Sequence, residues 1–210
     1  MGTEVALIFG SIPCENWEFL QPFRSKSLVI CADGGTICAA AAGFAPDIYI
    51  GDSDSGGIPP AGAETVLLPP EKDLTDLQAA YEYARRRGIR RVVLTACTGG
   101  RQDHHLANLA LLETAWRDGV EAAVLDARNA VAYLNGGSIR IPHGVFRYFS
   151  VIPMDARLCE VRIRNARYPL DVPELRRGDT LTVSNETLEG GSEVRIGSGA
   201  AWVVQSDRLK

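Results

Sequence analysis

Through the first 126 residues, short apolar runs alternate with segments in which apolar residues recur every three or four positions. Runs of the first kind are typical of buried strands and segments of the second kind of amphipathic helices. Their alternation indicates a parallel sheet whose strands are connected by helices. Six runs are predicted as strands: Val5–Phe9, Leu28–Cys31, Asp47–Ile50, Glu64–Leu68, Arg91–Ala96 and Ala122–Leu125.

Three segments between these runs are predicted as helices. The alanine-rich segment 37–42 ends at Gly43, a residue type that commonly terminates helices. A second helix begins after Thr75, because Thr75 and Gln78 have the spacing of a capping box and apolar residues follow at intervals of three and four. The third helix spans about Asp103 to Asp118, with Gly119 behind it.

After Asp126 no helical period follows, and seven short strand-like runs are separated by Gly, Pro and Asn turns. The pairs Gly136-Gly137 and Gly190-Gly191 are interpreted as hairpin turns. We therefore expect an N-terminal, mostly parallel α/β sandwich domain over residues 1–128 and a C-terminal all-β, sandwich- or barrel-like domain over residues 129–210. The runs are 131–134, 138–141, 145–152, 158–164, 180–183, 192–196 and 200–205.

Composition narrows the class of protein. The 210 residues are 46% apolar and include 22 Lys plus Arg against 26 Asp plus Glu, a formal net charge of −4, which argues against a polybasic surface for nucleic acid. The longest uncharged stretch, Gly34 to Pro46, has 13 residues, too few to span a bilayer. The first basic residue is Arg24, so no secretory or transit signal is indicated and a cytoplasmic location is expected.

The cysteine pattern bears on disulfide bonds and metal binding. The five cysteines lie in or near apolar segments and none has C-x-x-C spacing. This pattern is typical of buried, reduced thiols and favours neither disulfides nor a structural zinc site.

Residues that could bind a ligand follow directly after several predicted strands. The carboxyl ends of parallel strands meet at one edge of a sheet, so these residues are expected to lie close together. The first segment is Asp33-Gly34-Gly35, in which glycines allow backbone amides to approach a ligand. The second is residues 51–55, in which Asp52 and Asp54 present carboxylates to one hard cation. Either segment is also compatible with an ordinary polar turn.

Two further segments precede predicted helices. The segment from Lys72 to Asp76 combines a point charge for phosphate with oxygen donors for a cation. Asp73 or Thr75 would also serve simply to cap the helix, and Asp76 to complement its dipole. Residues 99–104 combine Gly99-Gly100 with the planar fork of Arg101 at a helix start, which is typical of an anion cradle. Adjacent His104 and His105 would point about 100° apart on a helix and make a poor metal pair. One of them is expected to form a local hydrogen bond and the other to lie on the surface.

Taken in order, these segments resemble the bacterial thiamine pyrophosphokinases. The matching motifs are ADGG at 32–35, PDIYIGDSDS at 46–55, EKDLTD at 71–76, GGRQDHHLAN at 99–108 and SNE at 184–186. The resemblance covers essentially the whole chain. The departures are small: Thr36 stands where the family usually has Ala, Leu74 and Leu77 replace more polar residues, and His105 replaces Thr.

The resemblance implies transfer of a diphosphate group from ATP to thiamine, which yields thiamine diphosphate and AMP, by a cytoplasmic homodimer. It also implies that thiamine lies between the α/β domain of one subunit and the β domain of its partner. The implied Mg²⁺ ligands are Asp52, Asp54 and Asp76, and these together with Arg101 form the implied catalytic set. The implied ATP-binding residues are Asp33, Gly34, Gly35, Lys72, Thr75, Gly99, Gly100, Arg101, Asp103 and Asn108, and the implied thiamine-binding residues are Ser184, Asn185 and Trp202.

Two other functions remain compatible with the residues. The first is diphosphate transfer to another small alcohol, such as a hydroxymethylpterin, in which only the acceptor site would differ. The second is a non-catalytic module that binds a nucleotide or thiamine. Three aspartates gathered without a cation would repel one another, and this argues against the second. The residues do not identify a general base.

Overall fold

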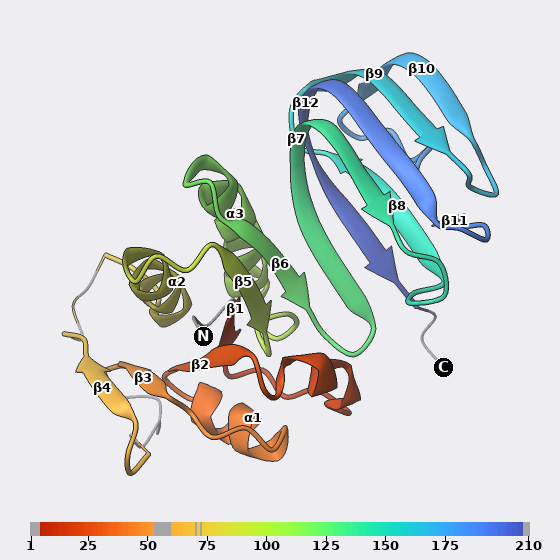
Figure 1. Ribbon diagram of the computed structural model, residues 1–210. Helices are drawn as coiled ribbons and strands as arrows, with labels where there is room; N and C mark the ends of the chain where they lie inside the picture. Colours follow the sequence, from red (N-terminus) through yellow and green to blue (C-terminus); the bar gives the residue numbers. More distant parts are fainter. Residues whose placement is uncertain (1–4, 53–59, 70, 72, 208–210) are drawn as a thin grey trace. The chain divides into compact units, whose positions relative to one another are not determined.

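The computed structural model describes residues 5–52, 60–69, 71 and 73–207. The chain forms two compact units, Met1–Ala127 and Arg128–Lys210 (Figure 1). It is a mixed α/β protein. Within the described residues, no helix is both long enough and apolar enough to cross a bilayer.

The described residues of the first unit form a six-stranded parallel sheet. Its strand order is β4-β3-β2-β1-β5-β6, and each neighbouring pair is parallel. All six predicted strands are present, with small shifts at their ends. Their bounds are β1 (Val5–Phe9), β2 (Ser27–Ala32), β3 (Ile48–Gly51), β4 (Glu64–Leu67), β5 (Arg91–Thr95) and β6 (Glu121–Leu125).

The three predicted helices are also present, as α1 (Gly35–Ala41), α2 (Asp76–Arg86) and α3 (Gln102–Arg117). Thr75 is the N-cap of α2, and its hydroxyl accepts a hydrogen bond from the Gln78 amide at 3.2 Å, as the capping-box spacing predicts. A short 3-10 helix, η1 (Glu18–Phe23), was not predicted from the sequence.

Helices pack against both faces of this sheet. Successive strand residues point to opposite sides, so strands that are apolar throughout need cover on each face. Leu7 and Phe9 of β1 pack with Leu20 of η1 and Cys38 and Ala39 of α1 in one apolar cluster. Helix α2 contacts β1, β2 and β3, and α3 contacts β6.

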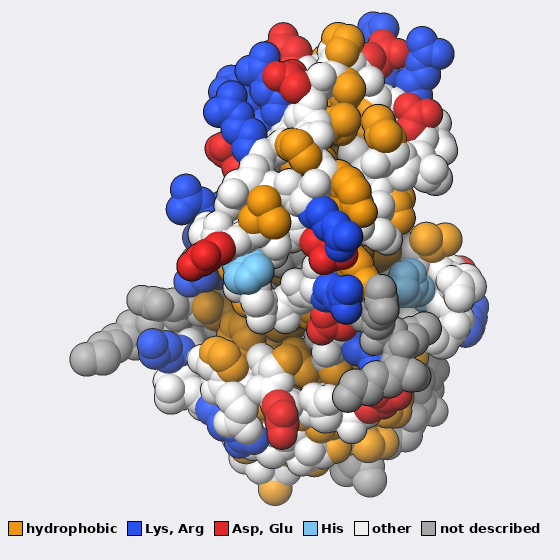
Figure 2. Space-filling view, turned by 90° about the vertical axis from the view of Figure 1, so that its right-hand side faces the viewer, with side chains coloured by type: hydrophobic (Ala, Val, Ile, Leu, Met, Phe, Trp, Pro, Cys, Tyr) orange, Lys and Arg blue, Asp and Glu red, His pale blue; other side chains and the backbone are white. Residues whose placement is uncertain are grey.

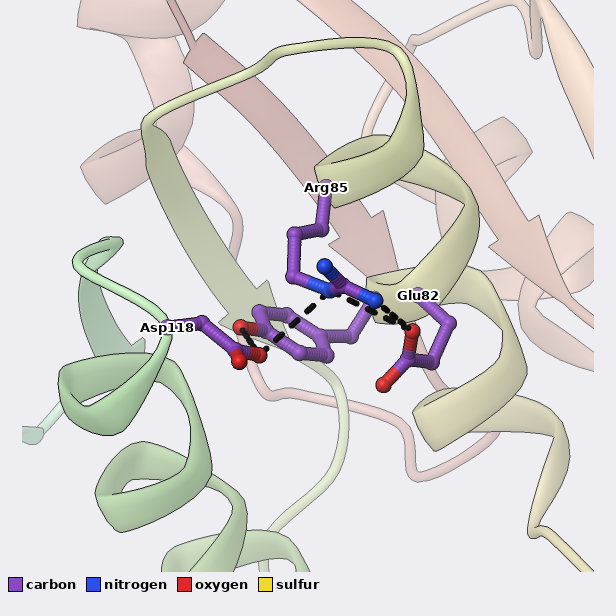
Figure 3. A network of polar contacts seen from close by, with 4 residues as sticks. Glu82, Arg85 and Asp118 are labelled. Carbon is purple, nitrogen blue, oxygen red and sulfur yellow. Dashed lines mark hydrogen bonds and ion pairs between the residues drawn. The ribbon is translucent and has the colours of Figure 1, made fainter.

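A polar network joins α2 to the end of α3. The Arg85 guanidinium lies between the carboxylates of Glu82 and Asp118 and contacts both (Figure 3). The distances are 2.7 Å to Glu82 and 3.4 Å to Asp118. The fully buried Tyr81 donates its hydroxyl to Asp118 Oδ2 at 2.7 Å. Burial and this carboxylate raise the pKa of Tyr81, so its hydroxyl stays protonated and holds the two helices together.

The second unit is built from antiparallel strands around its own apolar core. Strand β12 runs beside β7 along most of its length, while its first half pairs with β9 and its second half with β8. Strand β10 pairs with β9, and β11 pairs with β8. The bounds are β7 (Asn129–Ile141), β8 (Tyr148–Pro153), β9 (Arg157–Arg164), β10 (Leu170–Arg176), β11 (Asn185–Glu186) and β12 (Ser192–Ser206).

The interpretation of Gly136-Gly137 as a hairpin turn is wrong. Both glycines lie inside the continuous strand β7, where their φ angles are +63° and +84°. The predicted runs 192–196 and 200–205 likewise form one strand, β12. Its pairing with β7 shifts register between Ile196 and Ala200. The two glycines allow the positive φ angles that a β-bulge requires, and the strand therefore continues through the irregularity.

Other expectations in this unit also need correction. Gly190 and Gly191 lie in a turn closed by the Gly191 amide and the Leu188 carbonyl, but it is not a hairpin turn, because β11 and β12 pair with other strands. The predicted strand 180–183 is a turn; buried Thr182 instead donates its hydroxyl to the Val151 carbonyl at 2.6 Å. The strand expected from residue 145 begins at Tyr148.

Strand β10 was not predicted, because Pro173 interrupts its pattern. Proline lacks the amide hydrogen that a ladder needs, and it is therefore confined to edge strands or bulges. Strand β10 lies at the end of the strand order, and its register with β9 skips Pro173.

Charged side chains of both signs stand beside one another on the face shown in Figure 2. Ion pairs join neighbouring strands of the second unit, such as Arg162 of β9 with Asp171 of β10 at 3.1 Å. This mixture fits the small net charge of −4.

Candidate active site

The largest array of candidate residues lines a pocket of about 330 Å³ in the first unit. Its walls are the segments that follow β1, β2 and β5, together with the first residues of α2 and α3. This is the edge of a parallel sheet at which ligands commonly bind. The lining residues are Gly10, Ser11, Ile12, Ala32, Asp33, Thr75, Asp76, Leu77, Ala96, Cys97, Gly99, Arg101, His104 and Asn108.

Backbone hydrogen bonds hold two of these walls together. The Gly10 amide donates to the Thr95 carbonyl and the Ile12 amide to the Ala96 carbonyl, both at 2.8 Å. A Cβ atom at Gly10 would lie 2.6 Å from the Ala96 carbonyl oxygen, so only glycine permits this close approach.

Two carboxylates reach the pocket from separate elements. Asp33 follows β2 and is 7% exposed, with φ at +44°. The hydroxyl of Tyr49 donates to its Oδ1 at 3.2 Å. Asp76 is the first residue of α2, and Asp52 comes directly after β3 and is half-buried. The fold therefore brings Asp33 and Asp76, which are well separated in the sequence, to one pocket.

Arg101, the N-cap residue of α3, contributes a cation to the pocket. Its guanidinium is held by Asp103 through Nε to Oδ1 at 3.1 Å and Nη2 to Oδ2 at 2.6 Å. This pairing lowers the pKa of Asp103 to about 2, and it raises the pKa of Arg101. Both side chains are largely exposed, so water screens the attraction and the pair serves mainly to orient the guanidinium plane.

The two adjacent histidines have different roles. His105 accepts a hydrogen bond at Nδ1 from the Gly99 amide at 2.9 Å and so holds the loop before α3, whereas the exposed His104 lines the pocket. The expectation of one hydrogen-bonding and one surface histidine is confirmed. Asn108 supports the same loop, since its Nδ2 donates to the Cys97 carbonyl at 2.8 Å.

The predicted nucleotide residues divide into three groups. Asp33, Thr75, Gly99, Arg101 and Asn108 line the pocket, as does the predicted metal ligand Asp76. Gly34, Gly35, Gly100, Asp103 and the predicted metal ligand Asp52 are described but are not among its lining residues. Lys72 and Asp54 lie outside the described residues.

The donor chemistry of the pocket fits a hard cation. Mg²⁺ is usually bound by one or two carboxylates together with substrate phosphates, rather than by an all-protein cage. Asp33 and Asp76 supply carboxylates in one pocket. Among the described residues there is no group of three His, Cys, Asp or Glu arranged to hold a metal ion.

The predicted acceptor-site residues lie in the second unit. Asn185 is buried, and its side chain bonds the Tyr168 backbone at both the amide and the carbonyl, so it holds a loop in place. The neighbouring Ser184 is exposed at a φ of +61°, and its amide donates to Ser150 Oγ at 3.0 Å. Trp202 lies on β12 between two core residues, Ala201 and Val203. It therefore points to the opposite face of the sheet.

The sequence interpretation missed the segment Gly10 to Ile12 after β1, which lines the pocket. The signal was available, because these residues follow the first buried strand just as Asp33 follows the second. Cys97 also lines the pocket. Burial raises its pKa, so its thiol is neutral.

Comparison with known proteins gives consistent results. Residues 19–124 match a family profile described as the catalytic domain of thiamin pyrophosphokinase, and residues 138–201 match its vitamin B1 binding domain. A Bacillus subtilis thiamine pyrophosphokinase is 28% identical over 187 residues, which cover 86% of this chain and 87% of that protein. The crystal structure of thiamine pyrophosphokinase from Bacillus subtilis superposes with a TM-score of 0.86 at 27% identity, covering 98% of this chain and 99% of that one. The enzyme from Geobacillus thermodenitrificans gives a TM-score of 0.84 at 26% identity, with the same coverage.

Proposed function

We propose a role for each unit and each predicted site residue of this chain, which belongs to the thiamin pyrophosphokinase family. The chain transfers a diphosphate group from ATP to thiamine and forms thiamine diphosphate and AMP. In our proposal the first unit, taken as residues 1–128, binds ATP and carries out the transfer. The second, residues 129–210, binds thiamine.

The pocket in the first unit is proposed as the ATP site. The observation that carries this proposal is that acidic, basic and hydroxyl side chains from three separated motifs line one hollow: Asp33, Thr75, Asp76 and Arg101. Apolar Ile12 and Leu77 line the same hollow and suit the flat face of a base. Arg101 would bind a phosphate through its planar fork.

Asp52, Asp54 and Asp76 are proposed to hold Mg²⁺ on the nucleotide. When bound, the cation neutralises charge on the phosphates and helps to align them. The protein's own part is to fix the reactants in line, because phosphoryl transfer depends more on position and charge than on covalent help. The remaining predicted residues, Lys72, Gly34, Gly35, Gly99, Gly100, Asp103 and Asn108, are proposed to bind the nucleotide directly or to shape the loops that do so.

The acceptor site is proposed at the second unit, with Ser184, Asn185 and Trp202. Thiamine carries a cationic thiazolium ring, which an aromatic face or a carboxylate stabilises. A hollow of about 380 Å³ includes two carboxylates, and one of them, Glu186, directly follows Asn185 in the sequence. Its lining residues are His143–Arg147, Glu186, Thr187 and Asp207.

A homodimer is part of this proposal. Four apolar side chains near Ser184 are exposed in the single chain: Leu181 at 66%, Tyr168 at 59%, Val183 at 46% and Leu188 at 45%. Exposed apolar groups of this kind are commonly covered by a partner. Light scattering of the purified protein tests the dimer, and a monomer at working concentration would contradict it.

The decisive experiment is an assay of products. Purified protein is incubated with ATP, Mg²⁺ and thiamine, and thiamine diphosphate and AMP are expected in equal amounts. Replacing thiamine by a hydroxymethylpterin should abolish AMP formation, and leaving out Mg²⁺ should do the same. Release of ADP instead of AMP would contradict diphosphate transfer.

A further inference from the structure

A buried tyrosine contacts the pocket without lining it. Tyr49 lies on β3 and is 0% exposed. Its hydroxyl donates to Asp33 Oδ1 at 3.2 Å, and Asp33 lines the proposed ATP site whereas Tyr49 does not. Tyr49 therefore contacts a pocket-lining carboxylate without lining the pocket itself.

The strand register explains how this contact arises. Tyr49 pairs with Cys31 across β3 and β2, so the two side chains point to the same face of the sheet. Gly51 and Asp33, each two residues further along, follow on that face. A Cβ atom at Gly51 would lie 2.9 Å from the Tyr49 hydroxyl oxygen and 3.1 Å from Asp33 Cβ. Because Gly51 has no Cβ atom, there is space for the Tyr49 hydroxyl to reach the Asp33 carboxylate.

Asp33 itself adopts a backbone conformation that needs support. Its φ is +44°, a left-handed conformation uncommon for residues other than glycine, although Asp tolerates it better than most. The Asp33 amide donates to the Ile50 carbonyl at 2.8 Å. Strand β3 thus fixes both the backbone and the side chain of this residue, which is the kind of over-determined geometry found at functional sites.

We propose that Tyr49 is a positioning residue for ATP binding, which acts by holding the Asp33 carboxylate in one orientation toward the nucleotide or the cation it carries. This inference rests on the proposed function of the pocket. A carboxylate held in advance does not have to be ordered when the ligand binds, and affinity improves accordingly. Without the hydroxyl, the carboxylate is free to turn about its side-chain bonds.

A double-mutant cycle tests the proposal. Tyr49→Phe removes one hydroxyl and keeps the ring, and it is measured in the wild-type and Asp33→Asn backgrounds. One readout is kcat and KM for ATP and for thiamine. The other is the affinity, measured by calorimetry in the presence of Mg²⁺, for α,β-methylene-ATP. This ATP analogue cannot transfer its diphosphate group. Tyr81→Phe is the matched control, because Tyr81 is equally buried and its hydroxyl also bonds an aspartate. That aspartate, Asp118, is not among the residues that line the pocket, whereas Asp33 is.

In the wild-type background, Tyr49→Phe is expected to weaken binding of the analogue about tenfold, the size of effect that a hydrogen bond to a charged group supports. The KM for thiamine should not change, and Tyr81→Phe should retain wild-type affinity. In the Asp33→Asn background, Tyr49→Phe should have no further effect, because two residues acting as one unit are not additive. An equal loss in both backgrounds, or wild-type affinity in Tyr49→Phe while Asp33→Asn is impaired, would overturn the proposal.

Two further results separate the possible failures. If Asp33→Asn binds the analogue as tightly as wild type, the assignment of the pocket to the nucleotide fails, and the role of Tyr49 fails with it. If Tyr49→Phe does not fold, Gly51→Ala replaces it, since its methyl group would displace the hydroxyl without deleting it. Its effect should likewise disappear in the Asp33→Asn background, and an undiminished effect there would refute the positioning role.

Discussion

The Arg101 guanidinium and the Asp103 carboxylate meet in a two-point ion pair at the start of α3, with Nε to Oδ1 at 3.1 Å and Nη2 to Oδ2 at 2.6 Å. Arg101 lines the pocket and Asp103 does not. The family resemblance implies that Asp103 binds the nucleotide. The geometry instead favours a supporting role in which Asp103 orients the arginine that meets the phosphates.

We predict that Arg101→Lys lowers kcat/KM for ATP about 100-fold, because a point charge replaces a planar fork. Asp103→Asn should lower it about tenfold, since the fork is kept but held less firmly. Steady-state kinetics with a fixed excess of thiamine measure both. An Arg101→Lys variant with the wild-type rate would show that Arg101 is only a surface residue.

The same pair has a defined pH dependence. Because Arg101 lowers the pKa of Asp103 to about 2, the pair is fully formed above the ordinary aspartate pKa of about 3.9 and is lost only as pH falls through the lowered value. We predict that the ratio of kcat/KM between wild type and Asp103→Asn stays constant from about pH 5 to pH 9. A ratio that approaches one below pH 6 would contradict the lowered pKa.

Asp76→Asn is predicted to reduce Mg²⁺-dependent AMP formation about 100-fold or more, because it removes a charged oxygen from the proposed cation site. Its effect on stability should stay within about 1 kcal/mol, the scale of a charge at a helix start. Glu121→Gln is the control, since this carboxylate stands at the first residue of β6, at the other edge of the sheet, and is 77% exposed. Equal activities for the two variants would count against Asp76 as a ligand.

Gly34 and Gly35 are adjacent, yet we predict different effects for alanine. A Cβ atom at Gly35 would lie 2.2 Å from the Phe9 carbonyl oxygen, whereas at Gly34 its nearest neighbour would be the Ser11 Cβ at 3.1 Å. Gly35→Ala should therefore cost about 2 kcal/mol or more in the free energy of unfolding, and Gly34→Ala should cost under about 1 kcal/mol. Urea unfolding measures both. Equal stability of the two variants would refute the packing role of Gly35.

Trp202→Ala should raise the KM for thiamine more than the KM for ATP, because Trp202 points away from the core of the second unit. Its indole Nε1 is buried and makes no hydrogen bond within the described part of the chain. Trp116→Ala, on the exposed end of α3, controls for the loss of an indole. Equal increases in both KM values would indicate a packing role for Trp202.

Cys97 should resist alkylation although it lines the pocket. Burial, reinforced by the negative charge of Asp126, raises its pKa, so the reactive thiolate is scarce at neutral pH. We expect iodoacetamide at pH 7.5 to leave the Cys97 peptide unmodified by mass spectrometry, with modification increasing as the pH rises well above the ordinary thiol pKa. In urea, the same residue should react at the rate of a free cysteine. Rapid labelling of the folded protein would contradict the raised pKa.

The sequence by itself determined what depends on near neighbours along the chain. Buried runs predicted the six parallel strands, and the spacing of Thr75 and Gln78 predicted the cap of α2, because both patterns are read over a few residues. Strand ends also identified Asp33, Asp76 and Arg101 as polar residues at one edge of a sheet. Where a glycine pair or a proline interrupted the pattern, as at Gly136-Gly137 and Pro173, local interpretation failed.

Only the tertiary structure decided contacts that depend on register and on the absence of side chains. The contact between Tyr49 and Asp33 exists because β3 pairs with β2 in one register and Gly51 leaves room for the hydroxyl. The pairing of Gly10 with Thr95 likewise brings two loops into one pocket wall. Such contacts join residues far apart in sequence, and no local pattern encodes them, because their energies arise only when the strands have docked.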